Sequence, residues 1–492
     1  MFAAPLSQPR FGELVEGMMP PLGILYLAQY LRKVHPGLEL RATDGLTAGF
    51  QATVDEIKRF RPDVLCISAL TAAALGAYAL AERAKAEIPG VVVIMGGPHA
   101  SALPDDVLPR SKVDVVAVGE GEVTLAELVG LLLAKGRLSA EDLLSVPGVA
   151  FRLADGAIHR TYHRAHVVDL DTIPFPARDL LPLRGYRGYY LCKQTPEYTM
   201  MFSRGCPADC TFCANYHWNC AKPKVRWRSP KNVVDEMQEL RSLGIREIQD
   251  VADEFNNSVR NAAAICEEMI RRKLGMTWKT CVRAHPLPEE LVRLMAEAGC
   301  WAVSLGIESG NPETLEGVGK LVTLEQIESA CRLLNKYDIH VQGLMMLFNV
   351  WEENGQLRYE DMAMTEKSLQ FASKLVSARL VKYLGWSVAT PYPGSELYDI
   401  ALRHNLIKES LRGNWDAWIR DDPFVLRLPG ISVRDMARMK RKGSILRALC
   451  MLRSGHFGLK DVGIMAKKGL KVLATEMGAL AESRRSRPAA GA

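Results

Sequence analysis

The sequence predicts an α/β protein with two parallel-sheet units and a helical C-terminal extension. Short β-rich runs alternate with amphipathic helical patterns from residue 20 to about 133, and again from 198 to about 397. Such alternation is typical of parallel strands joined by crossover helices. A length of 492 residues also favours two or three domains. We expect a first domain over 1–146, a connector over 147–196, a second domain over 197–400 and the extension over 401–492.

The first domain is expected to be a Rossmann-like, doubly wound parallel sheet. Its apolar runs are short and rich in Val and Ile, whereas the segments between them carry the spacing of amphipathic helices. In chain order we expect a first strand within 2–6, a helix over 22–34, a strand over 63–68, a helix over about 72–87, and strands over 91–95 and 114–118.

Glycine-rich turns follow the last two of these strands, at 96–97 and at 119–121. Open parallel sheets bind ligands beyond the carboxyl ends of their strands, and glycine lets the backbone approach a large flat ligand closely. The region has no G-x-G-x-x-G motif. The turns therefore predict a ligand crevice, while a nicotinamide or flavin site is not supported.

The connector is rich in proline and has an expected hairpin at about 151–163. Proline disrupts helices and central strands. We therefore expect this segment to wrap one domain onto the other.

Cys206, Cys210 and Cys213 carry the strongest chemical signal in the chain. Three thiolates in one short loop can hold three irons of a 4Fe-4S cluster and leave the fourth iron open. A closed zinc site would need a fourth ligand, which Cys220 or His217 could supply, so zinc remains an alternative.

The other cysteines indicate a reducing compartment. The chain has eleven cysteines, an odd number, scattered without the pattern of a disulfide framework. No signal peptide and no apolar run of about 20 residues is evident. We expect a cytoplasmic protein.

The spacing C-x3-C-x2-C, with Phe212 before the last cysteine, resembles the signature of the radical S-adenosylmethionine (SAM) enzymes. In that family the open iron chelates the amino and carboxylate groups of SAM, and one electron cleaves SAM to a 5′-deoxyadenosyl radical. The resemblance implies that 197–400 forms a partial (β/α)6 barrel of the TIM type, open on one side. The active residues of such barrels lie on loops at the carboxyl ends of the strands.

Later segments also resemble motifs of this family, and they imply SAM-binding residues. Asp253 and Glu254 match the acidic motif after the second strand, and Arg283 follows the third strand. Arg283 suits the SAM carboxylate because a guanidinium pairs bidentately with it. Glu308 lies in a G-I-E-S-G motif, with Lys320 following as in relatives.

One departure from the family follows the fifth strand. Relatives commonly carry a G-x-P-G-E-T turn there, whereas residues 343–354 do not match it. The adenine and substrate contacts of that turn are therefore not assigned. Met345 and Met346 are interpreted as packing residues.

Segments 20–28, 96–101 and 119–122 resemble the cobalamin-binding domain that precedes many radical SAM cores. The D-x-H-x-x-G motif that supplies a cobalt-ligating histidine is absent, so His99 is interpreted as a turn histidine that bonds to backbone or to the nucleotide tail. The residues implied at this site are Thr71, Gly96, Gly97, His99, Gly119, Glu120 and Gly121.

The C-terminal extension is strongly basic: from Arg434 onward, 14 Lys and Arg oppose four Asp and Glu. Two interpretations compete, a solvated basic face on a helix packed against the barrel and an interfacial helix on an anionic membrane, and we favour the packed helix. Residues 482–492 are expected to be disordered. Nucleic acid is not an expected partner, because the whole chain is only +6.

The combined resemblance is to cobalamin-dependent radical SAM enzymes. It implies three cofactors (cobalamin, a 4Fe-4S cluster and SAM) and an external electron donor such as flavodoxin or ferredoxin. It favours methyl transfer to an unactivated carbon of a small-molecule, lipid-like or tetrapyrrole-like substrate. The alternative is an anaerobic oxidative cyclase or ring-remodelling enzyme of the same architecture. The sequence names neither the substrate nor a catalytic residue beyond cofactor binding.

Overall fold

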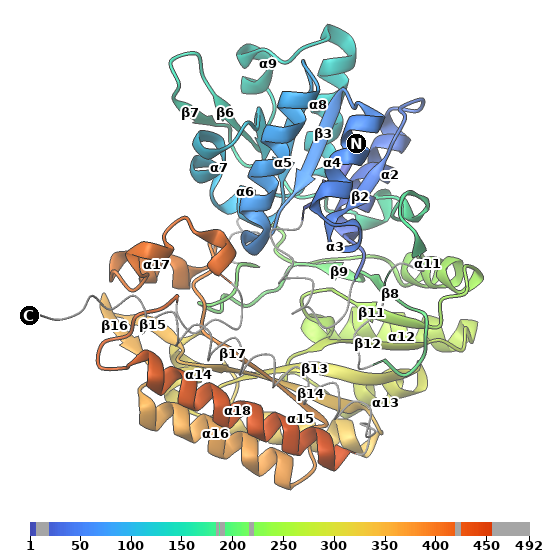
Figure 1. Ribbon diagram of the computed structural model, residues 1–492. Coiled ribbons are helices and arrows are strands. Elements are labelled where there is room, and N and C mark those ends of the chain that lie inside the picture. The colour runs from blue at the N-terminus through green and yellow to red at the C-terminus, as the bar shows by residue number, and fades with distance from the viewer. Residues whose placement is uncertain (6–18, 184–185, 187–191, 216–220, 419–424, 455–492) are drawn as a thin grey trace, which may run out of the picture.

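The computed structural model describes residues 1–5, 19–183, 186, 192–215, 221–418 and 425–454. Two α/β units face each other, with the N-terminal unit above the second unit in Figure 1. The elements of the N-terminal unit are β1 (Phe2–Ala4), α2 (Leu22–Val34), β2 (Ala42–Asp44), α3 (Gly45–Ala48), α4 (Phe50–Phe60), β3 (Val64–Ser68), α5 (Ala74–Glu87), β4 (Val92–Gly96), α6 (Pro98–Ala102), α7 (Pro104–Arg110), β5 (Val115–Ala117), α8 (Glu122–Lys135), α9 (Ala140–Leu144), β6 (Val149–Arg152) and β7 (Ile158–Arg160).

The first sheet has the strand order β2-β1-β3-β4-β5-β6-β7. Strands β1 to β5 pair in parallel, so the predicted Rossmann-like sheet is confirmed. The order 2-1-3-4-5 is that of a doubly wound sheet whose ligand crevice lies at the carboxyl ends of the strands.

The central parallel strands β3, β4 and β5 are mostly apolar, as expected of strands covered by helices on both faces of the sheet. Alternate residues of β3 and β4 enter different cores: Leu65 and Val93 join one buried cluster, whereas Cys66 and Ile94 join the other. Both glycine turns consequently extend from a sheet that is packed on both faces.

The connector begins with a hairpin that the sequence placed outside the first sheet. Strand β6 pairs antiparallel with β5, and β7 pairs with β6, so the hairpin extends the sheet instead. Val149, Ala150 and Phe151 of β6 are all buried, and burial of these apolar side chains favours docking of the hairpin on β5. The domain boundary at residue 147 itself stays a prediction.

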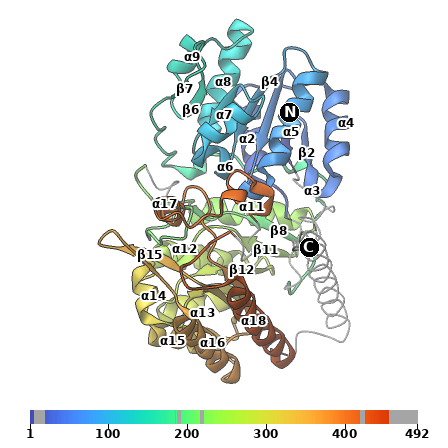
Figure 2. The same ribbon diagram turned by 60° about the vertical axis from the view of Figure 1, so that its left-hand side comes forward.

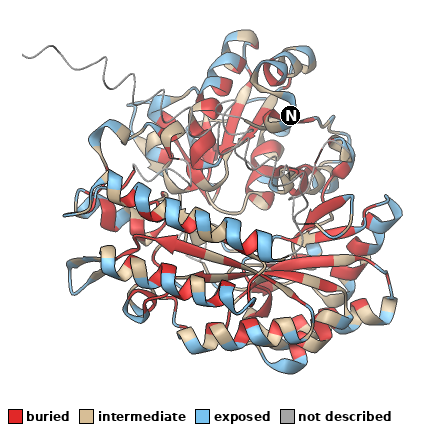
Figure 3. Ribbon diagram, turned by 60° about the horizontal axis from the view of Figure 1, so that its bottom comes forward, coloured by how far each residue is buried: buried red, intermediate tan, exposed pale blue. Residues whose placement is uncertain are grey.

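The second unit is a six-stranded parallel sheet of order β17-β14-β13-β12-β11-β8, with β8 and β17 at its two edges. The predicted partial barrel, open on one side, is confirmed. Figure 3 shows its buried strands in red inside helices whose outer faces are exposed. Its main elements are β8 (Glu197–Met200), α11 (Pro230–Ser242), β11 (Glu247–Asp250), α12 (Val259–Arg272), β12 (Thr277–Val282), α13 (Glu289–Glu297), β13 (Cys300–Glu308), α14 (Pro312–Gly317), α15 (Leu324–Lys336), β14 (His340–Leu347), α16 (Met362–Ser377), β17 (Tyr383–Val388) and α17 (Glu396–Arg403).

Two small ribbons decorate this sheet. β9 (Ser203–Arg204) pairs antiparallel with β10 (Arg226–Trp227), and β15 (Val350–Glu353) pairs with β16 (Gln356–Tyr359). The second ribbon occupies the place where the family's fifth-strand turn was missing. Met345 and Met346 are buried, as expected of packing residues.

The described part of the C-terminal extension contains the long helix α18 (Val433–Ser454), which runs along α16 in Figures 1 and 2. Met436, Met439 and Cys450 are buried, and Gly443 lies against Trp386 of β17. This part of the extension is therefore a packed helix. The remainder, 455–492, lies outside the described residues. In the part of the chain that the structure describes, no helix is both long and apolar enough to cross a bilayer.

Candidate active site

The three cysteines of the motif lie on one loop after β9. The main-chain N–H of Cys213 donates to the carbonyl of Cys210 at 3.0 Å, which folds the loop back on itself. The Cys206 thiol donates to Glu254 Oε2 at 3.3 Å. The loop thus presents its thiols at the carboxyl ends of the barrel strands, next to the second-strand acidic motif.

The environment disfavours free thiolates at all three positions. Burial, reinforced by the charge of Glu254, raises the pKa of Cys206 to about 12. Burial likewise raises the pKa of Cys213 to about 11. Burial also raises the pKa of Cys210, although the cations Lys320 and Arg283 oppose the shift. Metal binding would therefore have to displace protons from these sulfurs.

The zinc alternative is not tested by the structure. Within the described ranges, no three His, Cys, Asp or Glu side chains are grouped as ligands of a single metal ion. The candidate fourth ligands His217 and Cys220 lie outside those ranges.

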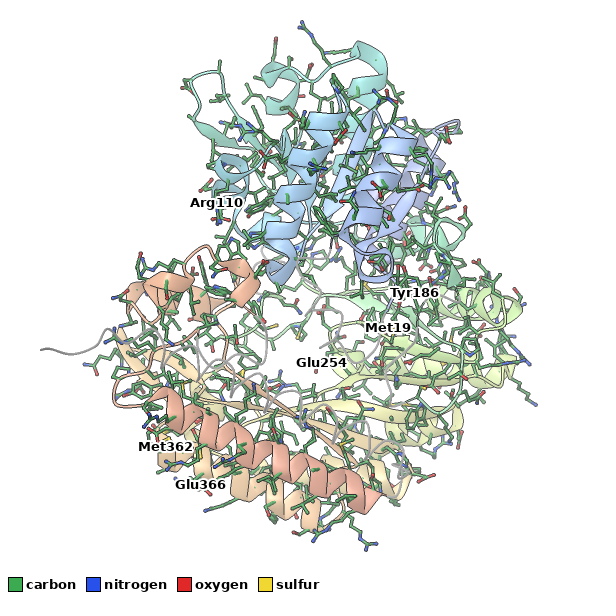
Figure 4. The ribbon with its side chains drawn as sticks, viewed as in Figure 1. Met19, Arg110, Tyr186, Glu254, Met362 and Glu366 are labelled. Atoms are coloured by element: carbon green, nitrogen blue, oxygen red, sulfur yellow. The ribbon has the colours of Figure 1, made fainter. Side chains whose placement is uncertain are left out.

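Asp253 and Glu254 follow β11 and contact the cysteine loop. Asp253 accepts hydrogen bonds from the Gly205 N–H at 2.8 Å and from Asn215 Nδ2 at 2.6 Å. Glu254 lies between the two units in Figure 4 and is mostly buried. Both predicted carboxylates thus reach the loop, and Asp253 fixes its backbone.

Glu308 and Lys320 form an ion pair near Cys210. Lys320 Nζ lies 3.1 Å from Glu308 Oε1, and Glu308 adopts a left-handed φ of 61°. A side chain at Gly306 would collide with both partners. Burial opposes the charge on Lys320, but Glu308 and the neighbouring Cys210 outweigh it and raise the pKa of the lysine.

Arg283 is brought to the same place by a buried backbone anchor. Asn256 accepts the Arg283 N–H at 2.9 Å and donates to the Arg283 carbonyl at 2.9 Å. The arginine is close enough to Cys210 to lower the pKa of that thiol in opposition to burial. Phe212 packs its partly buried ring against the main core. The predicted SAM residues therefore surround the cysteine loop.

A cavity of about 440 Å³ lies between the two units. Residues from the carboxyl ends of the first sheet line one side, and residues from the cysteine loop and the end of β11 line the other. The backbone suits a closely approaching ligand, because Gly119 has φ +82° and no atom lies within 4 Å of where its Cβ would stand. The lining includes Gly96, Gly97, Gly119, Glu120, Gly121, Glu122, His166, Arg204, Gly205, Asn215, Arg226 and Asp253.

His99 and Thr71 are not among the residues that line this cavity. His99 is fully buried, with Nε2 at 2.8 Å from the Tyr78 hydroxyl and Nδ1 at 3.4 Å from Thr71 Oγ1. The ring of Trp415, from the C-terminal extension, packs edge-on against it at 5.0 Å. Both ring nitrogens therefore have protein partners, and the predicted contact of these residues with a cofactor stays a prediction.

Several cavity residues have no counterpart among the sequence predictions. Arg204 and Arg226 form ion pairs with Glu120, and Arg204 also pairs with Glu122. His166 reaches the cavity from the connector. The sequence offered one signal for Arg204, which immediately precedes Gly205 and Cys206. Its ion-pair partners lie at least 82 residues away in the chain, so no local pattern identifies them.

Comparisons with known proteins agree with this arrangement. The family model of the B12 binding domain matches residues 12–129, and that of the radical SAM superfamily matches 200–355. An uncharacterized methyltransferase of Pyrococcus horikoshii is 31% identical over 90% of this chain and 91% of that protein. The chain belongs to the cobalamin-binding radical SAM enzymes.

Other members of the family are more distant. The anaerobic magnesium-protoporphyrin IX monomethyl ester cyclase of Rubrivivax gelatinosus is 30% identical over 79% of this chain and 67% of the cyclase. The hopanoid C-3 methylase of Methylococcus capsulatus is 27% identical over 77% of the chain and 68% of the methylase.

The fold matches a solved member of the family. The radical SAM methyltransferase TsrM of Kitasatospora setae, with cobalamin and a [4Fe-4S] cluster bound, has a TM-score of 0.68 at 18% identity, covering 91% of this chain and 88% of TsrM. At that identity the likeness concerns the fold. The predicted family and its three cofactors are confirmed by the two domain matches.

Proposed function

We propose that this radical SAM enzyme is a cobalamin-dependent C-methyltransferase that acts on a small molecule. The observation that carries the proposal is the single cavity bordered by both the glycine turns of the first sheet and the cysteine loop of the barrel. Methyl transfer is supported over cyclisation by the methyltransferase relative that aligns over 91% of its length, whereas the cyclase aligns over 67% of its own.

Cys206, Cys210 and Cys213 are proposed to hold the cluster. They share one short loop, and the cations Lys320 and Arg283 lie close enough to Cys210 to oppose the effect of burial on its pKa. When bound, the cluster and cobalamin supply radical initiation and a methyl donor, respectively. The protein contributes placement of these groups and exclusion of water.

Arg283, Glu308 and the acidic pair are proposed to orient SAM. Arg283 can pair with the SAM carboxylate, and Glu308 can accept hydrogen bonds from hydroxyl or amino groups. Lys320 holds Glu308 at 3.1 Å and so fixes the direction of that carboxylate. Glu254 accepts a hydrogen bond from the Cys206 thiol at 3.3 Å, and its carboxylate could accept hydrogen bonds from the SAM amino group.

The glycine turns are proposed to face cobalamin. Gly96, Gly97, Gly119 and Gly121 line the cavity, and Gly97 and Gly119 have the positive φ that favours glycine. At Gly97, which has φ +91°, a Cβ would lie 2.9 Å from the Ala69 nitrogen. At Gly121 it would lie 3.0 Å from Leu27 Cδ2.

Two partners belong to the same proposal. An external one-electron donor such as flavodoxin or ferredoxin is proposed to reduce the cluster.

Peripheral membrane contact through the basic extension remains a secondary proposal. It is supported by Ile445, Leu449 and Leu452, which share an exposed face of α18 because they are spaced four and three residues apart.

The test is isotopic. Anaerobically reconstituted protein is incubated with SAM carrying a deuteriomethyl group and an extract of its own host. A methyltransferase places the intact deuteriomethyl group in a new product. A cyclase gives a product that has lost hydrogen and carries no label, and that result would exclude the proposal.

Matched variants make the isotopic test specific. Glu308→Gln removes a charge at the site and should abolish labelling. Glu313→Gln changes an exposed glutamate on the neighbouring helix α14 and should leave labelling intact.

A further inference from the structure

The turn that follows β5 reaches across from the first unit to the second. Glu120 Oε1 lies 3.1 Å from Arg204 Nη1, and Glu120 Oε2 lies 2.8 Å from Arg226 Nη1. Glu122 Oε1 lies 2.6 Å from Arg204 Nη2. Two carboxylates of the cobalamin-binding unit thus pair with two guanidinium groups of the radical SAM unit. We call these four side chains the clamp.

The clamp is sheltered from solvent and balanced in charge. Its side chains are 13% (Arg204), 4% (Arg226), 15% (Glu120) and 5% (Glu122) exposed. Burial alone would raise the pKa of Glu120, but the hydrogen bond from Arg226 and the charges of both arginines outweigh it and lower the pKa. Each carboxylate of the clamp therefore has a guanidinium within 3.1 Å, and each guanidinium has a carboxylate.

Further contacts hold the arginines in these positions. The Arg204 guanidinium lies 5.6 Å from the centre of the Tyr26 ring of α2. Arg226 also donates to the carbonyl of Val167 in the connector at 3.1 Å. The first unit, the connector and the barrel consequently meet at this point.

The two arginines of the clamp belong to the β9–β10 ribbon that leads into the cysteine loop. Arg204 is the last residue of β9 and Arg226 the first of β10, and the two are directly paired in the ribbon. Gly205 and Cys206 follow Arg204 without a break. The ribbon is only two residues long on each side, so the arginine ion pairs add to the hydrogen bond from the Gly205 N–H to Asp253 in holding the start of the cysteine loop.

We propose that Glu120 and Glu122 are positioning residues that fix the cysteine loop against the cobalamin-binding unit and so set the relative placement of cluster and cobalamin. This inference rests on the proposed sites for both cofactors. It assigns Glu120 a different role from the predicted cofactor contact, since both of its carboxylate oxygens are already paired with arginine.

Hydrogen exchange gives a direct measurement that does not depend on turnover. The variants are Glu120→Gln and Glu122→Gln, which keep the side-chain size and remove the charge. We expect amide exchange of the peptide over 203–213 to accelerate roughly tenfold, because loss of an ion pair lowers the free energy needed to open the loop locally. The measurement is made on the full chain with both cofactors and repeated without them.

A matched control comes from the same helix as Glu122. Glu127 pairs with Arg164 at the surface and touches neither the loop nor the ribbon. Glu127→Gln should leave exchange over 203–213 unchanged. Equal acceleration in this control would mean that any charge lost from α8 loosens the loop, and the clamp would have no special role.

A double-mutant cycle tests the pairing itself. Glu120→Gln should accelerate exchange more than Arg226→Gln, because Glu120 pairs with both arginines. The double variant should show less than the sum of the two effects, because both changes remove the same Glu120–Arg226 pair. Fully additive effects would overturn the proposed pairing. Glu120→Asp, which keeps the charge on a shorter stem, should be intermediate.

A spectroscopic readout addresses the placement of the cofactors. In the reduced enzyme the magnetic interaction between the cluster and cob(II)alamin depends on their separation. Electron paramagnetic resonance should show this interaction weakened or broadened in Glu120→Gln and unchanged in Glu127→Gln, at equal iron and cobalamin content.

The outcomes separate this inference from its alternatives. Loss of cobalamin affinity in Glu120→Gln with unchanged exchange would make Glu120 a cofactor contact and overturn the clamp. Unchanged exchange and unchanged spectra in both variants would do the same. Failure of the methyltransferase proposal alone would leave the exchange result standing, because it is measured without substrate.

Discussion

Single residues at the proposed SAM site have little space around them, and Gly306 shows this most directly. It lies on β13 two residues before Glu308, and a Cβ there would meet both the Glu308 carboxylate and the Lys320 ammonium. The ion pair that is proposed to orient SAM therefore depends on the absence of a side chain.

We predict that Gly306→Ala weakens SAM binding and slows 5′-deoxyadenosine formation by roughly 100-fold, since misplacing a catalytic group by about 1 Å can cost that much. Binding is measured by equilibrium dialysis and the product by chromatography. Gly343→Ala on β14 is the control, because its Cβ would meet aliphatic side chains only. Unchanged SAM cleavage in Gly306→Ala would contradict the assignment of Glu308.

A second prediction concerns the cysteines. Replacing Cys206, Cys210 and Cys213 together with alanine should abolish iron binding and 5′-deoxyadenosine production, because only these cysteines share the loop. Iron is counted per monomer after anaerobic reconstitution. Cys331→Ala, on the buried face of α15, should retain full iron content. Equal iron in the triple variant and the wild-type protein would show that the ligands lie elsewhere.

For single residues, the sequence revealed sites made by neighbours in the chain but not contacts between residues far apart in it. The cysteine motif is local, so its spacing alone indicated a cluster loop. Arg204 and Arg226 act through Glu120 and Glu122, which belong to another domain, and no local pattern reports such pairing. His99 was singled out by its turn, but burial and Tyr78 decide its contacts.

Among the elements, the connector is fixed to the barrel by a buried charge cluster. Glu236 of α11 is fully buried between Arg178 of the connector and Arg228, and it forms ion pairs with both. The ring of Tyr198 lies 5.3 Å from the Arg178 guanidinium carbon. The proline-rich segment therefore has a specific anchor on the second unit.

We predict that Glu236→Gln lowers the free energy of unfolding by about 3–5 kcal/mol, because it leaves two buried arginines without a countercharge. Glu239→Gln, an exposed change on the same helix, should alter it by less than about 0.5 kcal/mol. Urea denaturation followed by circular dichroism provides the comparison. Similar midpoints for the two variants would show that the cluster contributes little.

Helix α18 provides another test, because Gly443 packs against Trp386. A Cβ at Gly443 would lie 2.8 Å from Trp386 Cδ2. Gly443→Leu should destabilise the protein by about 1–3 kcal/mol through overpacking, although leucine favours a helix over glycine by up to about 1 kcal/mol. Ala448→Leu, at an exposed position of α18, should be neutral in thermal unfolding. A stabilised Gly443→Leu variant would contradict tight packing of α18 on β17.

Long periodic helices and the short apolar strands β1, β3, β4 and β5 were predictable, whereas β2 was not. Helix α2 was expected over 22–34 and is found as Leu22–Val34. β2 has three residues, Ala42–Asp44, too few to show a period, and its place beside β1 comes from pairing across the chain. The hairpin β6–β7 was recognised, but its attachment to β5 depends on a buried face that sequence pattern does not locate.

At the scale of the whole molecule, the two sheets turn the carboxyl ends of their strands toward one cavity. Trp415 of the extension donates to Asp106 of the first unit at 2.8 Å, and Asp106 also accepts from Tyr78. The clamp provides a further contact between the units. This shared cavity is why the protein is proposed to use both cofactors in one reaction.

The most direct test of that claim counts SAM molecules. A methyltransferase that also generates a radical consumes two SAM per turnover, one as methyl donor and one as radical source. We predict that S-adenosylhomocysteine and 5′-deoxyadenosine form in equal amounts, each in step with the methylated product, when all three are quantified by mass spectrometry. Product accompanied by 5′-deoxyadenosine without matching S-adenosylhomocysteine would contradict methyl transfer and favour the cyclase.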